Sequence, residues 1–227
     1  MTSYYSERLS GDRLQRCYEL APPRVQQYLE SEIQYLLERI GPEDAVLELG
    51  CGYGRVALRL AERASRVVGV DVADESLVLA RTLAGPDAAC EFVLMDALHM
   101  SFADGSFDVV VCIQNGISAF GVSQSELVCE ALRVVRPGGR LIFSTYSDAF
   151  WADRLSWFEL QSSEGLVGPI DHRATGDGVI VCTDSFRSGT TTPIELEQLC
   201  SELGVTATIT EVDGSSLFCE ASKPCAT

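Results

Sequence analysis

Short apolar runs alternate along the chain with segments in which apolar residues recur at helical spacing. One run begins at Ala45, a second ends at Asp71, and two more cover 90–95 and 107–113. The last of these is apolar almost throughout, as in strands that are buried on both faces of a parallel sheet. The pattern predicts an α/β fold in which strands and helices alternate.

The second half of the chain continues this alternation. A helical pattern over 123–135 meets a stop signal at 136–139, Arg-Pro-Gly-Gly, and a fifth strand is expected over 140–145. The later expected elements are a helix over 193–203 and strands over 206–212 and 216–221. These elements fill one sheet-centred domain, so we expect no second full domain in 227 residues.

The first 42 residues precede the first core strand and contain an amphipathic helix. We expect it to begin near Pro22-Pro23 and to run through Ile40 to Gly41-Pro42, because proline suits the start of a helix and glycine its end. Its apolar positions are Val25, Tyr28, Leu29, Ile33, Leu36 and Leu37. We interpret 1–42 as a helical extension and 43–227 as the main domain.

Residues 147–192 separate the fifth strand from the next helix and form a second variable region. Residues 178–186 are expected to form an added strand. The first half carries aromatic residues at roughly helical intervals, namely Phe150, Trp151, Trp157 and Phe158. A segment inserted here covers the carboxyl ends of the parallel strands, where open α/β folds bind ligands. We therefore expect 147–192 to be a small cap over a pocket.

The first strand runs directly into a turn with glycine at alternate positions, Gly50, Gly52 and Gly54. Glycine permits backbone conformations that a Cβ forbids and lets the backbone approach a ligand closely. A dinucleotide fold requires G-x-G-x-x-G, whose third glycine would fall at Arg55. The spacing therefore opposes a nicotinamide oxidoreductase. Asp71 ends the second strand 17 residues after Gly54.

Five ordered landmarks resemble those of the class I S-adenosylmethionine-dependent methyltransferases over about residues 45–145. They are Glu48-Leu-Gly-Cys-Gly-Tyr-Gly54, Asp71, Asp96-Ala97, Phe107-Asp108 and Arg136-Pro-Gly-Gly139. The resemblance implies a Rossmann-like, seven-stranded, mostly parallel sheet with helices on both faces and an antiparallel last strand. It also implies that the N-terminal extension is a lid and that the cap is inserted after strand five.

The resemblance implies S-adenosylmethionine as the cofactor and S-adenosylhomocysteine as the product. In this family the glycine turn packs under the methionine moiety, and Asp71 matches the acid that accepts hydrogen bonds from both ribose hydroxyls. The full set of expected cofactor contacts is Glu48 near the amino group, Gly50, Cys51, Gly52 and Gly54 in the turn, Asp71 at the ribose, Val72, Asp96 and Ala97 at the adenine, and Gln114 and Asn115 near the sulfonium.

The acceptor side has fewer signals. A general base is needed only where the acceptor keeps its proton, and His172 in the cap is the first candidate because imidazole exchanges protons near neutral pH. The alternative for His172 is a surface or structural histidine. Tyr146, which follows strand five, is expected to border the acceptor. The candidate lid contacts are Tyr4, Tyr5, Arg13 and Tyr18.

The charge of the chain bears on its partners. Acidic residues number 33 against 17 basic ones, the formal net charge is −16, and Lys223 is the only lysine. Proteins that bind nucleic acid normally carry a basic surface, so we expect a small-molecule substrate and no nucleic-acid partner. The sequence has neither a long apolar run nor a signal-peptide core, so we expect no membrane partner and a cytoplasmic location. The oligomeric state stays open.

Nine cysteines are scattered through mostly apolar segments, which is typical of reduced core residues. The sequence shows no C-x-x-C pair and no His-rich tract, so no metal site is expected. The acceptor atom (oxygen, nitrogen or sulfur) stays open. One alternative is S-methylation of a thiol or of arsenite, with Cys17 and Cys182 as contributors. Another is a non-catalytic regulatory module that binds S-adenosylmethionine.

Overall fold

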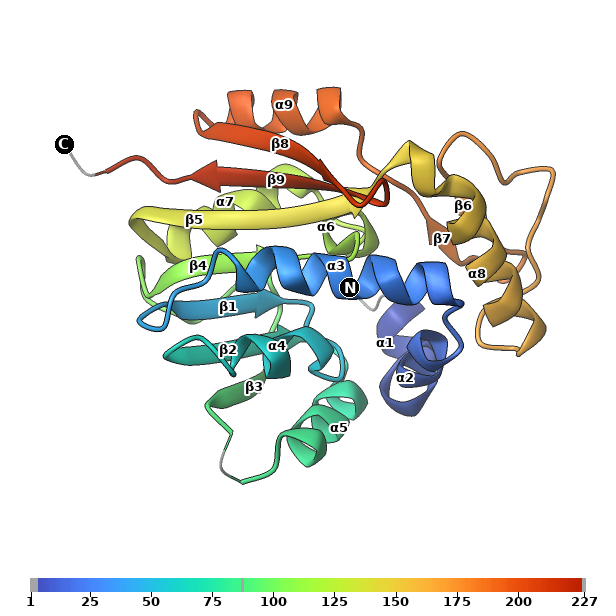
Figure 1. Cartoon of the computed structure of the whole chain (residues 1–227), viewed down its shortest axis with the longest axis horizontal. Coiled ribbons are helices and arrows are strands. Elements are labelled where there is room, and N and C mark those ends of the chain that lie inside the picture. Colours follow the sequence, from blue (N-terminus) through green and yellow to red (C-terminus); the bar gives the residue numbers. More distant parts are fainter. Residues whose placement is uncertain (1–3, 87, 226–227) are drawn as a thin grey trace.

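The computed structural model describes residues 4–86 and 88–225, and a seven-stranded sheet forms its centre (Figure 1). The strand order is β3-β2-β1-β4-β5-β9-β8. The strands are β1 (Ala45–Leu49), β2 (Arg66–Asp71), β3 (Cys90–Leu94), β4 (Phe107–Cys112), β5 (Val135–Tyr146), β8 (Thr206–Val212) and β9 (Ser216–Ser222). Strands β1 to β5 pair in parallel, whereas β9 is antiparallel to β5 and β8. The predicted sheet is confirmed.

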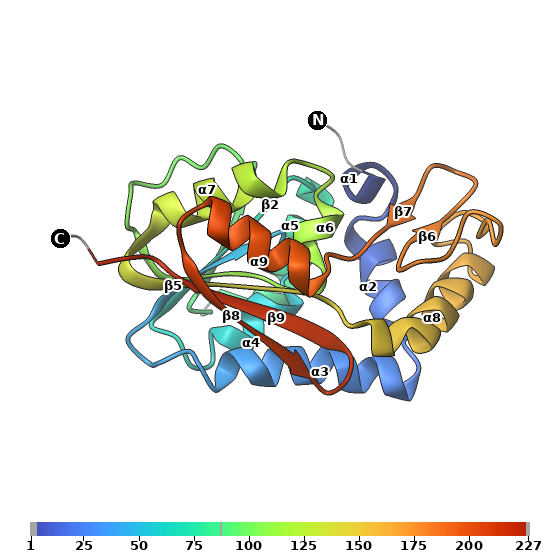
Figure 2. The ribbon, with the colours of Figure 1, turned by 90° about the horizontal axis from the view of Figure 1, so that it is seen from above.

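Helices cover both faces of this sheet, as predicted (Figure 2). One face carries α3 (Pro23–Leu37), α4 (Arg55–Leu60) and α5 (Asp74–Ala84), and the other carries α6 (Gly116–Ala119), α7 (Gln124–Val134) and α9 (Pro193–Glu202). Successive side chains of a strand point to opposite faces. Val46 therefore packs under the first set of helices and Leu47 under the second, and both are fully buried. Within the described part of the chain, no helix is long and apolar enough to cross a membrane.

The N-terminal helices and the cap pack together beyond the carboxyl ends of the parallel strands, at the right of Figure 1. The elements are α1 (Tyr4–Arg8), α2 (Gly11–Glu19), a 3-10 turn (Asp148–Phe150), α8 (Trp151–Ser163), β6 (Ile180–Val181) and β7 (Arg187–Ser188). Trp157 Nε1 donates to the Cys17 carbonyl at 2.9 Å, and the Tyr4 hydroxyl donates to the Asp184 carboxylate at 2.5 Å. Segments far apart in the sequence thus form one cluster, which we call the aromatic layer. Its buried rings are those of Tyr28, Tyr146, Phe150, Trp157, Phe158 and Phe186, with Tyr4, Tyr5 and Tyr18 packed against them.

One predicted element differs in this layer. The segment before α3 is helical, because α1 and α2 precede α3, and Leu9 and Cys17 are buried against the cap. The strand predicted over 178–186 is replaced by the short pair β6 and β7. The chain reverses between them, since Ser185 has a φ of +80° and the Cys182 amide donates to the Phe186 carbonyl at 2.9 Å.

The start of β5 also differs from the prediction. The strand begins at Val135 and includes the Arg-Pro-Gly-Gly segment that was expected to precede it. The C-terminal segment pairs with this stretch, because the Gly138 amide donates to the Lys223 carbonyl and the Lys223 amide donates to the Gly139 carbonyl, each at 3.0 Å. A partner distant in sequence therefore extends the strand through residues that by themselves favour a turn.

Candidate functional site

The candidate site lies at the carboxyl ends of the central strands. The strand order runs outward from β1 to β3 on one side and from β4 to β5 on the other, so the connection reverses direction between β1 and β4. Open α/β sheets bind ligands outside the carboxyl ends of the strands at this reversal point. The loops that follow β1, β2 and β4 meet there, and they contain most of the predicted cofactor residues.

The glycine turn after β1 requires glycine for steric reasons. The φ angles of Gly50, Gly52 and Gly54 are +68°, +53° and +82°, in the left-handed region that side chains disfavour. A Cβ on Gly54 would lie 2.6 Å from Phe92 Cζ, and one on Gly50 would lie 2.9 Å from Phe120 Cζ. The turn therefore exposes backbone where other residues would place side chains.

Asp71 holds this turn in place from the end of β2. One of its carboxylate oxygens accepts from the Gly52 amide at 2.8 Å, and the other accepts from the Ala73 amide at 2.9 Å. Burial raises the pKa of Asp71, whereas these amide donors lower it. Each carboxylate oxygen has a second lone pair, so Asp71 can still accept hydrogen bonds from a ligand. The neighbouring Val72 is 46% exposed and leaves an apolar surface beside it.

Three side chains around the turn have buried polar atoms without partners in the described residues. These atoms are Glu48 Oε2, Arg55 Nε and Nη2, and Gln114 Nε2. Burial raises the pKa of Glu48 to about 8, against the opposing effect of the Arg55 charge. Buried polar groups are normally paired, so these atoms are suited to bind a polar ligand. An acid beside a guanidinium suits the ammonium and carboxylate of an amino-acid moiety.

Arg55 was not among the predicted site residues. It follows Gly54 directly, and its guanidinium carbon lies 5.0 Å from the centre of the Tyr18 ring. Its position at the start of α4, beside the glycine turn, was the signal that the sequence offered. The predicted lid residue Arg13 lies elsewhere, since its guanidinium donates to the Gly165 and Leu166 carbonyls in the cap.

The turn after β4 is unusual because two consecutive non-glycine residues have positive φ angles. Gln114 and Asn115 have φ values of +57° and +60°. Buried Glu32 on α3 accepts from the Gln114 amide at 3.0 Å, and Asn115 accepts from the Thr145 hydroxyl at 2.8 Å. Strained backbone of this kind concentrates at functional sites. Glu32 is a residue that the sequence reasoning missed, because it lies on the apolar face of a helix.

Asp96 and Ala97 follow β3. Asp96 is about half exposed at its side chain, accepts from the Leu98 amide at 2.9 Å, and has His99 Nδ1 at 3.6 Å. Ala97 is 2% exposed and packs in the core under α7. Cys51 is also buried, and its Sγ would lie 2.8 Å from a Cβ on Gly69, which agrees with a packing role.

The predicted acceptor residues separate in space. Tyr146 is buried at the end of β5, with its ring 5.6 Å from that of Tyr28. His172 lies in an exposed turn of the cap, and no hydrogen bond within the described residues joins it to the glycine turn. Its role as a base stays a prediction.

The lid residues also differ in their surroundings. Tyr18 contacts Tyr53 and lies over Arg55, whereas Tyr4 and Tyr5 pack on Phe186 in the cap. Of the lid helices, α2 contacts the turn directly, because a Cβ on Gly52 would lie 2.9 Å from Leu14 Cδ2. The N-terminal extension therefore lies on the cofactor side and on the cap side at once.

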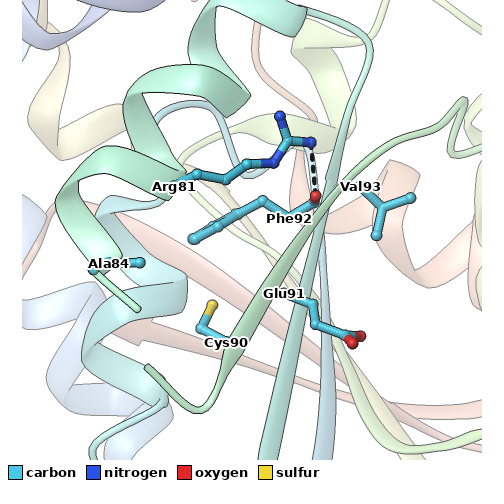
Figure 3. Close-up of a pocket in the computed structure, with 7 residues that line it drawn as sticks. Arg81, Ala84, Cys90, Glu91, Phe92 and Val93 are labelled. Atoms are coloured by element: carbon cyan, nitrogen blue, oxygen red, sulfur yellow. Dashed lines mark hydrogen bonds between the residues drawn. The ribbon is translucent and has the colours of Figure 1, made fainter. Parts of the chain in front are cut away.

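A surface hollow of about 400 Å³ is found away from this site (Figure 3). It lies between the end of α5 and the edge strand β3, where Arg81 donates to the Phe92 carbonyl at 2.9 Å. Its other lining residues include Cys90 and Glu91, at the amino end of β3. None of the residues that line it belongs to the glycine turn.

Comparisons with known proteins agree with the fold. The family model of a methyltransferase domain matches residues 46–139. The 2-methyl-6-phytyl-1,4-hydroquinone methyltransferase of Synechocystis sp. is 30% identical over 146 residues, which cover 60% of this chain and 45% of that protein. The match thus spans less than half of the relative's length.

Solved structures extend the likeness over most of the chain. An S-adenosylmethionine-dependent methyltransferase of Methanosarcina mazei has a TM-score of 0.64 at 22% identity, with 85% of this chain and 98% of that chain covered. The N-methyltransferase NodS of Bradyrhizobium japonicum, solved with S-adenosylhomocysteine, has a TM-score of 0.58 at 17% identity, with 89% and 88% covered. The central part of the chain thus matches the model of a methyltransferase domain, and its fold is that of the solved S-adenosylmethionine-dependent methyltransferases.

Proposed function

We propose that the protein transfers a methyl group from S-adenosylmethionine to a small-molecule acceptor. The observation that carries the proposal is the group of unpaired, buried polar atoms on Glu48, Arg55 and Gln114 around the glycine turn. A zwitterionic amino-acid moiety supplies both partners that these atoms lack. The match to the model of a methyltransferase domain supports the same cofactor.

The cofactor contacts follow from this arrangement. Glu48 would bind the ammonium group, and Arg55 would bind the carboxylate of the methionine moiety. Asp71 would accept from the ribose hydroxyls, with Val72 against the adenine and Asp96 and the Ala97 amide near its amino group. The methionine moiety would lie over the turn residues Gly50, Cys51, Gly52 and Gly54. The sulfonium would be bordered by Gln114 and Asn115.

When bound, the cofactor supplies an electrophilic methyl group whose carbon–sulfur bonding pair returns to sulfur as the acceptor's lone pair forms the new bond. The protein's part is to align the acceptor and to exclude water. Tyr146 and the lid residues Tyr5 and Tyr18 belong to the aromatic layer that would do so. Where the acceptor carries a proton, His172 would receive it, and Tyr146 would border the acceptor.

A small aromatic acceptor is favoured by the surroundings of this layer. The rings of Tyr28 in α3, Phe150 and Phe158 in the cap and Tyr146 at the end of β5 pack into one cluster. The relative in Synechocystis, by its name, is a methyltransferase of a hydroquinone. The net charge of −16 opposes a nucleic-acid substrate.

The test is methyl transfer from isotopically labelled S-adenosylmethionine into a cell extract, separated into small-molecule, protein and nucleic-acid fractions and analysed by mass spectrometry. We expect label in one small molecule. Label in protein or nucleic acid would contradict the acceptor class and keep the chemistry. In parallel, calorimetry measures binding of S-adenosylhomocysteine and of NADH. If only NADH binds, the assignment of the glycine turn to S-adenosylmethionine is wrong.

No specific observation favours the thiol or arsenite alternative. Cys17 and Cys182 are both buried in the aromatic layer, and burial raises the pKa of Cys17 to about 12 and that of Cys182 to about 11. They are therefore neutral thiols at physiological pH, which are weak ligands for a soft acceptor. In the described ranges, no three His, Cys, Asp or Glu side chains come together as a metal site would require.

A further inference from the structure

Arg154 of α8 is a buried cation with no carboxylate partner among residues 4–86 and 88–225. Arg154 is 1% exposed. Its Nη1 donates to the Gly178 carbonyl at 3.0 Å, and its Nη2 donates to the Ser188 carbonyl at 2.7 Å, the Ser188 hydroxyl at 2.9 Å and the Gly189 carbonyl at 3.2 Å. All of these acceptors are neutral. The buried Nε has no acceptor in this part of the chain.

The lack of an acid at Arg154 contrasts with the composition of the chain. Acidic residues outnumber basic ones by 33 to 17, and less buried arginines find partners readily. Arg24, for example, pairs with Asp213 at 2.7 Å. A buried charge without a counter-charge is costly, and burial accordingly lowers the pKa of Arg154. The charge therefore calls for an anion from outside the chain.

Aromatic rings surround the guanidinium. Its central carbon lies 4.2 Å from the ring centre of Tyr146, 5.8 Å from that of Trp151 and 5.9 Å from that of Phe158. Ring faces offset part of the cost of the charge, but they do not neutralise it. A ligand with an aromatic ring would match these surroundings in polarity.

Arg154 is also close to the place where the acceptor is expected. The Gly189 carbonyl accepts both from Arg154 Nη2 and from Asn115 Nδ2, the latter at 3.0 Å. Asn115 follows β4 in the strained turn, and Tyr146 ends β5. One shared carbonyl thus joins the guanidinium to the turn that would border the sulfonium.

We propose that the acceptor is a small aromatic carboxylic acid and that Arg154 binds its carboxylate. This inference rests on the proposed function and names the chemical class of its substrate. Arg154 is then a specificity-determining residue, since the methyl group goes to another atom of the acceptor. A guanidinium suits the role because it stays charged and donates hydrogen bonds in a fixed plane.

The test compares acids with their uncharged amides. Calorimetry measures binding of benzoate, 4-hydroxybenzoate and 1-naphthoate, each against its amide, to the full chain with and without S-adenosylhomocysteine. For at least one pair we expect the wild type to bind the acid about tenfold or more tightly than the amide, as a charge-assisted hydrogen bond predicts. Equal binding within every pair, or no binding of any acid, would overturn the proposal.

Three variants assign the preference to this side chain. Arg154→Gln should abolish it, and Arg154→Lys, which keeps the charge, should retain part of it. Arg24→Gln is the matched control, because Arg24 also lies over a cap ring, that of Phe150 at 5.0 Å, yet has its own acid partner. The acid preference could instead persist in both Arg154→Gln and Arg154→Lys, with Arg154→Lys losing stability. That result would overturn the proposal, and Arg154 would then only support the cap loop.

The two proposals fail in different ways. Failure of S-adenosylhomocysteine to bind the wild type would contradict the proposed function, while the acid preference would still be measured in the protein without it. Binding of S-adenosylhomocysteine together with equal affinity for acids and amides would leave the methyltransferase proposal standing and overturn only the role of Arg154.

Discussion

The glycine-turn side and the cap side of the molecule each contain an arginine with a buried Nε that has no partner in the described residues, but the two surroundings differ. Arg55 lies beside the glycine turn and interacts electrostatically with the buried acids Glu48 and Glu32. Arg154 lies in the cap among aromatic rings and backbone carbonyls, with no acid partner in the described ranges. A site with both signs of charge suits a zwitterion, whereas a site with one sign suits an anion.

The two sides also differ in how they are assembled. The glycine turn is fixed by contacts between the ends of neighbouring strands, such as those of Asp71. The cap is held to the N-terminal helices by packing between segments more than 100 residues apart, as in the bond from Trp157 to Cys17. A single truncation should therefore loosen the cap side more than the cofactor side.

The largest effect is expected from Trp157→Ala. Trp157 is 4% exposed and packs on Tyr18 and Phe158, so its loss should cost about 3–5 kcal/mol of unfolding free energy. Denaturant titration measures the loss, and hydrogen exchange should locate it in α1, α2 and α8. Trp151→Ala, at a more exposed ring of the same helix, is the control with a smaller cost. Uniform loss of protection across the sheet would contradict the comparison.

Asp71→Ala should weaken binding of S-adenosylhomocysteine by about 100-fold, because it removes a charged acceptor for the ribose and the brace of the Gly52 amide. Calorimetry measures the affinity. Asp74→Ala is the matched control, since Asp74 is an exposed acid three residues further along and should leave affinity unchanged. Equal effects of the two substitutions would show that Asp71 acts only through overall charge.

Glu48→Gln should reduce the dependence of cofactor affinity on pH. The change in affinity at any one pH should be about tenfold at most. The pKa of Glu48 is raised to about 8, so at pH 7 it is mainly protonated, and an ammonium group bound beside it favours the ionised form. Wild-type binding should therefore release up to about one proton near pH 7 and strengthen as pH rises from 6 to 8. Calorimetry in buffers of different ionisation enthalpy counts the proton.

The same residue affects stability in the absence of ligand. Because burial raises the pKa of Glu48 above its value in the unfolded chain, its contribution to stability is present at low pH and is lost as pH rises toward about 8. Glu48→Gln should remove this loss. Glu32→Gln is the control for the proton release on cofactor binding described above. If that release disappears in Glu32→Gln but persists in Glu48→Gln, its assignment to Glu48 is wrong.

The smallest effect is expected from replacing Cys17 and Cys182 together with alanine. Both thiols are buried in the aromatic layer away from the glycine turn, so affinity for S-adenosylhomocysteine should change by less than about twofold. Methyl transfer to the small molecule found in the extract should also persist. Loss of transfer with unchanged cofactor affinity would instead favour a thiol or arsenite acceptor.

The sequence predicted the strands and the turn on the glycine-turn side well because its signals there are local. A strand of apolar residues, three glycines at alternate positions and an acid at the end of the next strand are each fixed by neighbours in the chain, and the structure brings them together as expected. The added strand of the cap was wrong because a two-residue pairing and a tight turn leave almost no periodic signal.

What the sequence by itself determined is the order of strands and helices, and hence the sheet and the edge at which a ligand binds. Only the tertiary structure decided which charges are buried. Glu32 on the apolar face of α3 reaches the Gln114 amide, and Arg154 reaches carbonyls 24 to 35 residues away. The physical reason is that periodicity records which face of an element is inside, whereas the pairing of a buried charge depends on contacts between elements that the sequence places far apart.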